Sequence, residues 1–335
     1  MNHQEREVFW KTLCSFTGKD PEAECNELVQ IIKLPRYLFR YRSVNIQSLE
    51  ALRTNKLYFS SANYYDDPFD TFLHIDIEKI KEECSKVLRY LVDKKVAVEC
   101  IKKMFADMLT EEQIKQITVE NLEGIFSRNF IEDILGLALS LRDEVKKDTW
   151  SVCFSEKGFN EVLWLKYANQ HKGFVQIYDL ENDDNWLCGK QSKCEKCNMT
   201  ICRTSLYPVH YSDTPYDATN FAKVVMLRKI EEMTRIPTPM KVYDELGKGY
   251  WEREKTTLIK KECHKYDEEW RMVLDRPLMP PVVRKWIPSG IILGLRMNPA
   301  EENLVISIAK EAGIKNIYKS YIDENNRLNG LPIEF

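Results

Sequence analysis

The chain has 335 residues, of which 44% are hydrophobic and 30% charged, and its formal net charge is −3 at pH 7. This composition indicates a globular protein with a sizeable core and excludes a disordered or fibrous chain. The small negative charge gives no bulk positive field for a phosphate backbone, so a dedicated duplex-DNA binder is not expected. The 12 glycines form no G-x-G-x-x-G, G-x-x-x-x-G-K-[ST] or G-x-S-x-G pattern. Rossmann, Walker-type and serine-hydrolase sites therefore lack their sequence signals.

Neither a membrane span nor a secretion signal is predicted. The longest apolar runs, such as Ile134–Leu139, are far shorter than the ~20 residues that cross a bilayer. Residues 1–20 lack the apolar centre of a signal peptide. We therefore expect a cytoplasmic protein without a membrane partner.

The N-terminal part of the chain predicts helices followed by a strand, a helix and a second strand. Residues 1–34 carry an apolar stripe at helical spacing, and Pro21 marks a second helix start, so we expect an N-terminal helical extension over 1–34. Pro35 ends this extension. Aromatic and basic residues alternate over 37–42, and a second short strand is expected at 57–60.

The rest of the chain interleaves helices and strands. Apolar residues at mixed three- and four-residue spacing predict a helical insertion at about 75–147. Strand patterns return at 150–155 and 173–178, and a cysteine-rich loop is expected at about 186–203. The strand spacing is too uneven for a repeated βαβ series. We therefore predict an α+β fold, with a mixed, mostly antiparallel sheet in one composite domain over 35–335.

Several short motifs follow one another along the chain. They are Leu38–Ser43, Leu57–Ser61, Asp66–Asp70, Cys153–Ser155, Trp164–Phe174, Tyr266–Arg271 and Ile291–Gly294. Together, over roughly residues 37–320, they resemble the bacterial family known as domain of unknown function 2971. The resemblance implies the fold of that family and its set of site residues, and it leaves the reaction to be argued from the residues themselves.

Two arginines stand out in the first predicted strand. Arg40 and Arg42 alternate with Phe39 and Tyr41, so both guanidinium groups leave the same face of the strand. Paired arginines suit bidentate binding of a phosphate or a carboxylate. The other interpretation is that both are solvated charges on the outer face of a half-buried strand.

Three carboxylates follow the second predicted strand. Asp66, Asp67 and Asp70 lie within five residues, and Pro68 favours an extended conformation at Asp67. They could hold Mg²⁺ or Ca²⁺, cap the next helix, or pair with the strand arginines. We favour a structural turn that also forms a wall of the site.

The segment Trp164–Phe174 combines a helix with a polar turn. The helix carries Trp164 and Tyr167, and the turn carries His171 and Lys172. His171 is either a general acid, base or hydrogen-bond donor, or a turn residue that caps the preceding helix.

A late strand places a glutamate beside an arginine. Alternation puts Glu269 and Arg271 on one face of this strand and Trp270 on the other. A carboxylate in such surroundings suits stabilisation of an oxocarbenium-like centre. A structural salt bridge of Glu269 with an arginine is the other interpretation.

The same residue types, in the same chain order, occur in enzymes of the ADP-ribosyltransferase class, which bind NAD without a Rossmann pattern. Those enzymes use an early-strand arginine or histidine, a middle-strand serine or tyrosine and a late-strand glutamate. In this sequence Arg40 or Arg42, Ser60 or Ser155, and Glu269 would fill these places. Three residue types in order carry little information alone.

Four cysteines form the most specific local signal. The spacing Cys188-x5-Cys194-x2-Cys197-x4-Cys202 can close a tetrahedral Zn²⁺ shell, which predicts a structural zinc. Free thiols or a redox pair are the alternatives, and His210 could replace one thiol.

Three functions follow from these patterns. The first is a nucleotide-processing enzyme, ADP-ribosyltransferase-like or otherwise, whose substrate is NAD or a related nucleotide. The second is a non-catalytic module that senses a nucleotide or anionic ligand and recruits a protein partner, for instance in phage defence or stress response. The third is a metal-dependent phosphodiesterase. The expected catalytic residues are Glu269, Arg42, Ser60 and His171, and the expected ligand-binding residues are Arg40, Tyr41, Tyr58, Asp67, Phe69, Asp70, Ser155, Trp164, Tyr167, Lys172 and Arg271.

Overall fold

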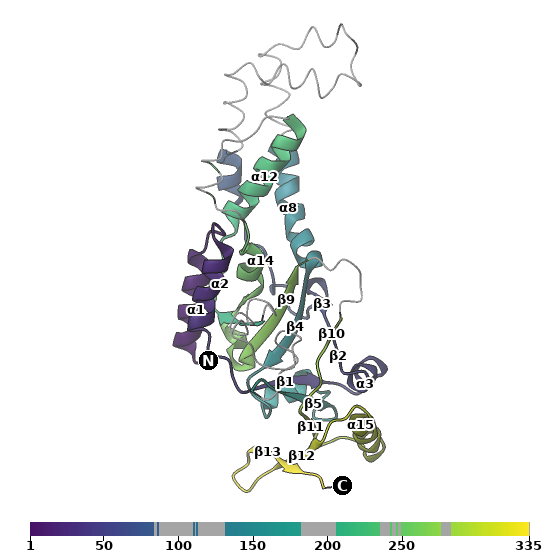
Figure 1. The fold of residues 1–335 in the computed structure, drawn as a ribbon. Helices are drawn as coiled ribbons and strands as arrows, with labels where there is room; N and C mark the ends of the chain where they lie inside the picture. The colour runs from purple at the N-terminus through teal and green to yellow at the C-terminus, as the bar shows by residue number, and fades with distance from the viewer. Residues whose placement is uncertain are drawn as a thin grey trace.

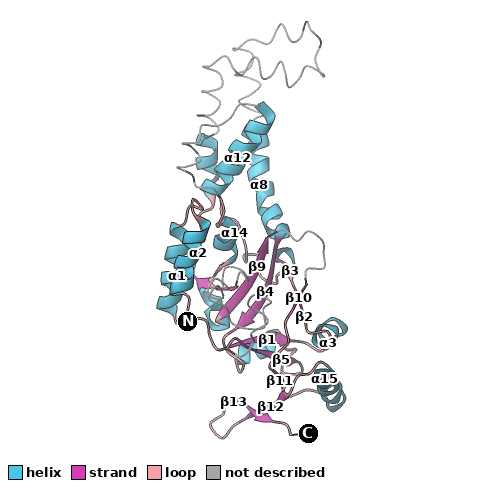
Figure 2. Ribbon diagram, viewed as in Figure 1, coloured by secondary structure: helices cyan, strands magenta, loops and turns pink. Residues whose placement is uncertain are grey.

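A nine-stranded sheet organises the molecule. The computed structural model describes residues 1–83, 86, 110, 112, 131–181, 206–234, 242, 246, 249–275 and 283–334. Within these residues, helices surround a mixed, mostly antiparallel sheet (Figure 1, Figure 2). The predicted α+β class and the predicted sheet type are confirmed.

Eight of the strands form one continuous path, and β3 (Ser60–Ser61) pairs with β4 beside it. In this sheet β11 and β12 run parallel, and the other neighbours run antiparallel. The path runs through β13 (Leu328–Pro332), β12 (Asn316–Ile322), β11 (Gly290–Leu293), β5 (Phe174–Asp179), β1 (Tyr37–Arg42), β4 (Thr149–Ser155), β9 (Glu269–Asp275) and β6 (Leu206–Pro208).

The sheet splays between β1 and β4. β1 pairs with β5 along its whole length, but it meets β4 at one position, where Phe39 lies opposite Ser155. β4 and β9 pair over their full length, with Cys153 opposite Arg271. Figure 1 accordingly shows β1 and β5 running across the direction of β4 and β9. Beyond Phe39, β1 is therefore not paired with β4.

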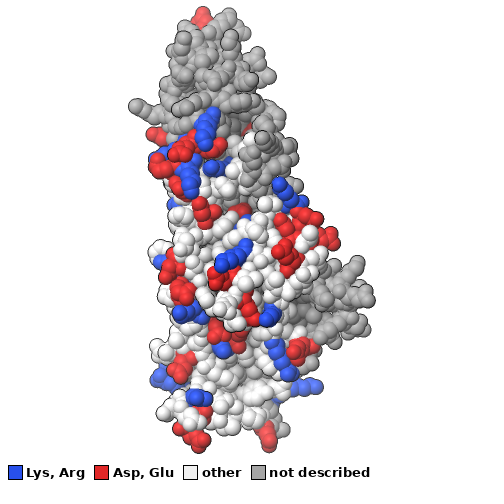
Figure 3. All heavy atoms as spheres, turned by 90° about the vertical axis from the view of Figure 1, so that its left-hand side faces the viewer, with Lys and Arg blue, Asp and Glu red and all other residues white. Residues whose placement is uncertain are grey.

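The N-terminal helices belong to the core of the sheet. α1 (His3–Ser15) begins with a capping box of Asn2 and Glu5, and α2 (Pro21–Ile31) has a proline in its first turn. Side chains from both helices share one buried cluster with β4 and β9. The cluster includes Phe9, Leu13, Leu28, Val152, Phe154, Trp270 and Met272. On the face that α1 and α2 cover, the described acidic and basic side chains are interspersed (Figure 3).

The remaining elements surround the sheet. Two shorter strand pairs join β2 (Lys56–Tyr58) to β10 (Val283–Lys285) and β7 (His210–Tyr211) to β8 (Ile259–Lys260). The other helices and 3-10 turns near the sheet are α3 (Ile46–Arg53), η1 (Ala62–Tyr64), α9 (Glu161–Lys166), α14 (Glu252–Thr257), η4 (Glu262–Asp267) and α15 (Pro299–Glu311).

A pair of long helices projects from one end of the sheet. α8 (Ile131–Asp148) and α12 (Thr219–Thr234) lie side by side in Figure 1 and share a buried cluster that includes Leu141, Val145 and Ala222. The predicted insertion at about 75–147 is helical at 77–83 and in α8, and most of its middle lies outside the described residues. None of the described helices is long and apolar enough to span a bilayer.

Candidate functional site

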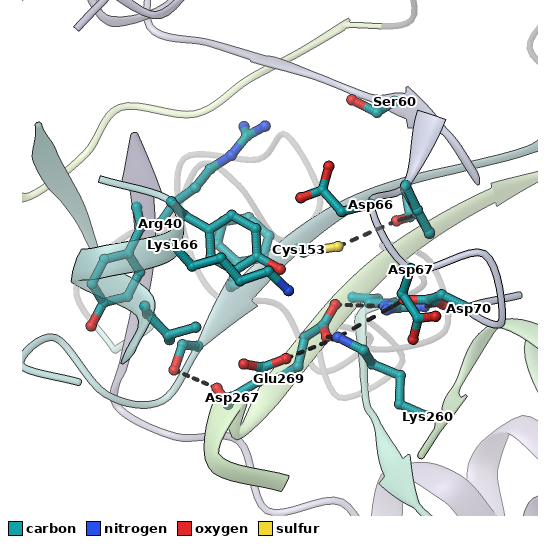
Figure 4. Close-up of a pocket in the computed structure, with 18 of the residues that line it drawn as sticks. Arg40, Ser60, Asp66, Asp67, Asp70, Cys153, Lys166, Lys260, Asp267 and Glu269 are labelled. Atoms are coloured by element: carbon teal, nitrogen blue, oxygen red, sulfur yellow. Dashed lines mark hydrogen bonds and ion pairs between the residues drawn. The ribbon is translucent and has the colours of Figure 1, made fainter. Parts of the chain in front are cut away.

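A cavity of about 260 Å³ opens where β1 diverges from β4 and β9 (Figure 4). Side chains from these strands, from the segment 60–70 and from α9 line it. Its volume is close to the lower end of small-molecule pockets. The predicted site residues that the structure brings together here are Arg40, Tyr41, Arg42, Ser60, Asp67, Asp70, Ser155, Tyr167, Glu269 and Arg271.

Other predicted residues lie elsewhere. Trp164 is fully buried and stacks on His171 with 5.7 Å between the ring centres, so its ring is not presented to the cavity. The backbone N–H of His171 donates to the carbonyl of Trp164 in the last turn of α9, whose C-cap is Tyr167. Phe69 is exposed, and the Nζ of Lys261 lies over its ring, 3.6 Å from the ring centre. Tyr58 and Lys172 are likewise absent from the cavity lining, and Cys188, Cys194, Cys197 and Cys202 lie outside the described residues.

The two β1 arginines face the cavity with almost no protein partners. Arg40 donates to the carbonyl oxygen of Tyr58 at 3.3 Å. Within the described ranges, the Arg42 guanidinium has no hydrogen bond or ion pair. Burial lowers the pKa of Arg42 to about 9, and the neighbouring Arg40 adds to this shift. Arg42 therefore places in the cavity a positive charge that pairs with none of the described acidic groups.

Arg271 is the centre of a buried ion-pair network on the other side of the cavity. Its Nη1 and Nη2 donate to Oδ1 and Oδ2 of Asp70 at 2.7 and 2.6 Å, and its Nε donates to Oε1 of Glu269 at 2.6 Å. Nη1 also donates to the carbonyl oxygen of Thr257 at 2.6 Å. Because Asp70 gives both oxygens to Arg271, it pairs with that residue and not with the β1 arginines, and it is not free to hold a cation.

Lys260 extends this network. Its Nζ lies 2.9 Å from Oδ2 of Asp267 and 2.9 Å from Oε2 of Glu269. Burial opposes ionisation of Glu269, but Arg271 and Lys260 outweigh it and hold the pKa of this carboxyl well below its usual range. Burial also raises the pKa of Asp267. Glu269 is therefore ionised near neutral pH, with each of its oxygens held by a cation.

Two features of the backbone fix the start of β9, where Glu269 lies. Glu268 has a φ of 41°, in the left-handed region, so the chain turns sharply between η4 and β9. From α1, the Arg6 Nη1 donates to the carbonyl oxygens of Val209 and Glu269 at 2.7 and 2.8 Å. The N-terminal helix thus fixes the first residue of β9, which carries the central carboxylate.

Lys260 and Cys153 line the cavity, although no sequence pattern predicted them as site residues. Lys260 lies in a polar stretch whose two-residue strand has no recognisable alternation. Cys153 is adjacent to the core residue Val152 in β4, so its side chain leaves the other face of the strand. A cysteine in an apolar strand is nevertheless usually interpreted as a small core residue. Cys153 lies opposite Arg271 in the β4–β9 ladder.

Cys153 is expected to react slowly in the folded protein. Burial, with Glu269 adding to it, raises the pKa of its thiol to about 12. At pH 8 iodoacetamide should therefore label it ~10³-fold more slowly than an ordinary thiol. Mass spectrometry of labelled peptides measures this rate, with exposed Cys263 as the control in the same sample. Equal labelling of the two cysteines in the native protein would contradict the prediction.

Comparison with known proteins adds no further constraint on this cavity. No family model, curated protein or solved structure matches the chain. The function must therefore be argued from the geometry of the site.

Proposed function

We propose that the cavity binds a small phosphorylated ligand of the nucleotide class, with a phosphate on Arg40 and Arg42. We further propose that the protein processes this ligand as an ADP-ribosyltransferase-like or related enzyme, with NAD or a similar nucleotide as its substrate. One observation carries the proposal. The Arg42 guanidinium lines the cavity without an acidic partner among the described residues.

Electrostatics explains why this observation favours an anion. Two guanidinium groups close together repel each other, and burial removes the water that would screen them. A phosphate between Arg40 and Arg42 would supply the missing negative charge and accept the paired N–H groups of each fork. Burial, with the neighbouring Arg40 adding to it, lowers the pKa of Arg42 to about 9, the direction expected of a buried cation without a counter-ion.

The carboxylate side of the cavity supports the proposed chemistry. In transfer from NAD, the C–N bond to nicotinamide breaks and its electron pair leaves with the nicotinamide nitrogen. The ribosyl carbon then bonds to an acceptor hydroxyl, amine or water, which loses a proton. Positive charge develops on the ribose in between, and a fixed negative group such as ionised Glu269 stabilises it.

One observation favours the second function, a sensor without catalysis. Arg271 and Lys260 hold the two oxygens of Glu269 at 2.6 and 2.9 Å. A carboxylate held in this way contributes charge but has less capacity to bond a ribose hydroxyl. A sensing module needs only the anion site on Arg40 and Arg42.

Thermal unfolding with added ligands tests the anion site. NAD, ADP-ribose or ATP at a hundred times its dissociation constant should stabilise the wild-type protein by about 2.7 kcal/mol. Arg42→Ala should abolish the rise in melting temperature. Arg53→Ala is the matched control, because exposed Arg53 on α3 pairs only with Glu50 in the described structure and lies outside the cavity. If none of these compounds stabilises the wild type, the proposed nucleotide site is wrong.

A further inference from the structure

Nine of the ten charged residues that line the cavity fall into two groups that do not pair with each other, and the tenth, Lys166 at the end of α9, has no ion pair with either group in the described part of the chain. β1 supplies Arg40 and Arg42. The other group contains five carboxylates and two cations, and the cations pair with three of the carboxylates; in Figure 4 Arg40 lies apart from Lys260, Asp267 and Glu269. In the described part of the chain, no ion pair connects the β1 arginines to this group. Its members are Asp66, Asp67, Asp70, Asp267, Glu269, Lys260 and Arg271.

Asp66 is the most accessible negative charge of this second group, because Asp67 is half-buried and lies 3.3 Å from Nε2 of His264. Asp70, Asp267 and Glu269 are each at most 6% exposed and are held by Arg271 or Lys260. By contrast, Asp66 is exposed and, among the described residues, has no hydrogen bond or ion pair. Figure 4 shows its carboxylate directed into the cavity. A ligand anchored on the β1 arginines would therefore meet uncompensated negative charge at Asp66.

Aromatic rings accompany these carboxylates. Tyr64 lines the cavity and is 80% exposed. The Arg271 guanidinium lies 5.4 Å from the centre of the Tyr65 ring, and the Lys166 ammonium lies 5.0 Å from the centre of the Tyr167 ring. Aromatic faces beside carboxylates attract organic cations. Two rings of this cavity thus already engage protein cations.

We infer that the ligand carries an organic cation as well as a phosphate, and that Asp66 recognises the cation. This inference rests on the proposed function, because the phosphate on Arg40 and Arg42 orients the rest of the ligand. Two sources share the chemistry: a nucleotide with a pyridinium ring, and a phosphate ester of a quaternary ammonium alcohol. A neutral ligand of the same shape gains nothing from Asp66, whereas a second anion there is repelled.

Calorimetric titration with two matched probe pairs tests the inference. Nicotinamide mononucleotide and its reduced form differ in the charge of the ring. Phosphocholine and 3,3-dimethylbutyl phosphate differ in the charge of the head group. Wild-type protein should bind the cationic member of one pair about tenfold more tightly than the neutral member. The pair that shows this preference identifies the source of the cation.

Two variants separate the inference from the proposed function. Asp66→Asn should reduce the preference for the cationic probe to less than about threefold and leave the neutral probe unaffected. Asp143→Asn is the matched control, because exposed Asp143 on α8 is not a lining residue. Arg42→Ala should weaken all four probes. Equal binding within both pairs by the wild type would overturn the cation inference and keep the phosphate site, and no binding of any probe would overturn both.

Discussion

Replacement of Arg271 by methionine is expected to lower the free energy of unfolding by about 3–5 kcal/mol, which is the usual cost of removing one partner from a buried ion pair. Arg271 is 1% exposed, and its loss leaves Asp70 without a cation that bonds both of its oxygens. Glu269 keeps Lys260, so only part of the network survives.

Urea unfolding followed by tryptophan fluorescence measures this change. The matched control is Arg53→Met, which removes an exposed arginine from a pair with Glu50 on the same helix and should cost less than about 0.5 kcal/mol. If Arg271→Met does not fold, Asp70→Asn removes the other partner of the same pair and gives the measurement. A loss below about 1 kcal/mol in both site variants would show that the network contributes little to stability.

The Glu269→Gln variant is expected to lose turnover by about 10² to 10³-fold if the protein is the proposed transferase, because glutamine keeps the size of the side chain and removes its charge. Binding of NAD should change by no more than a few fold, since the phosphate is held by Arg40 and Arg42. Turnover is measured as release of nicotinamide, and affinity by calorimetry of the same preparation.

Glu268→Gln provides a control at the neighbouring position. The Glu268 side chain is 36% exposed, its carboxylate lies 3.6 Å from Lys157, and it is not a lining residue. The Glu268→Gln variant should keep full turnover. Wild-type protein that binds NAD but releases no nicotinamide would favour the sensor over the enzyme.

The strands that carry the site could be predicted from the sequence because their patterns are local. Alternation in β9 places Trp270 in the core and directs Glu269 and Arg271 to the cavity, as expected. In β1, Arg40 and Arg42 both line the cavity, but Phe39 and Tyr41 line it as well, so alternation alone does not select the two arginines there. The alternation of side chains along a strand does not depend on its neighbours, so it can be predicted without the order of strands in the sheet.

The partners of these residues could not be predicted in the same way. Asp70 and Arg271 are 201 positions apart, and no local pattern states which carboxylate an arginine will meet. The sheet order decides this pairing, and the order depends on packing across the whole domain. His171 shows the opposite limit. Its polar turn suggested chemistry, but in the structure its ring stacks on buried Trp164 and its backbone N–H donates to the Trp164 carbonyl.

The bond from Arg6 in α1 to the carbonyl of Glu269 spans 263 positions, and this separation constrains how the protein is made. The first helix leaves the ribosome long before β9 exists. At about 5–20 residues per second, roughly 10 to 50 s pass before its partner is synthesised. During that time the apolar face of Phe9 and Leu13 lacks the strand residues that bury it. Until translation is almost complete, this face of α1 can therefore pack only against neighbours such as Leu28 of α2.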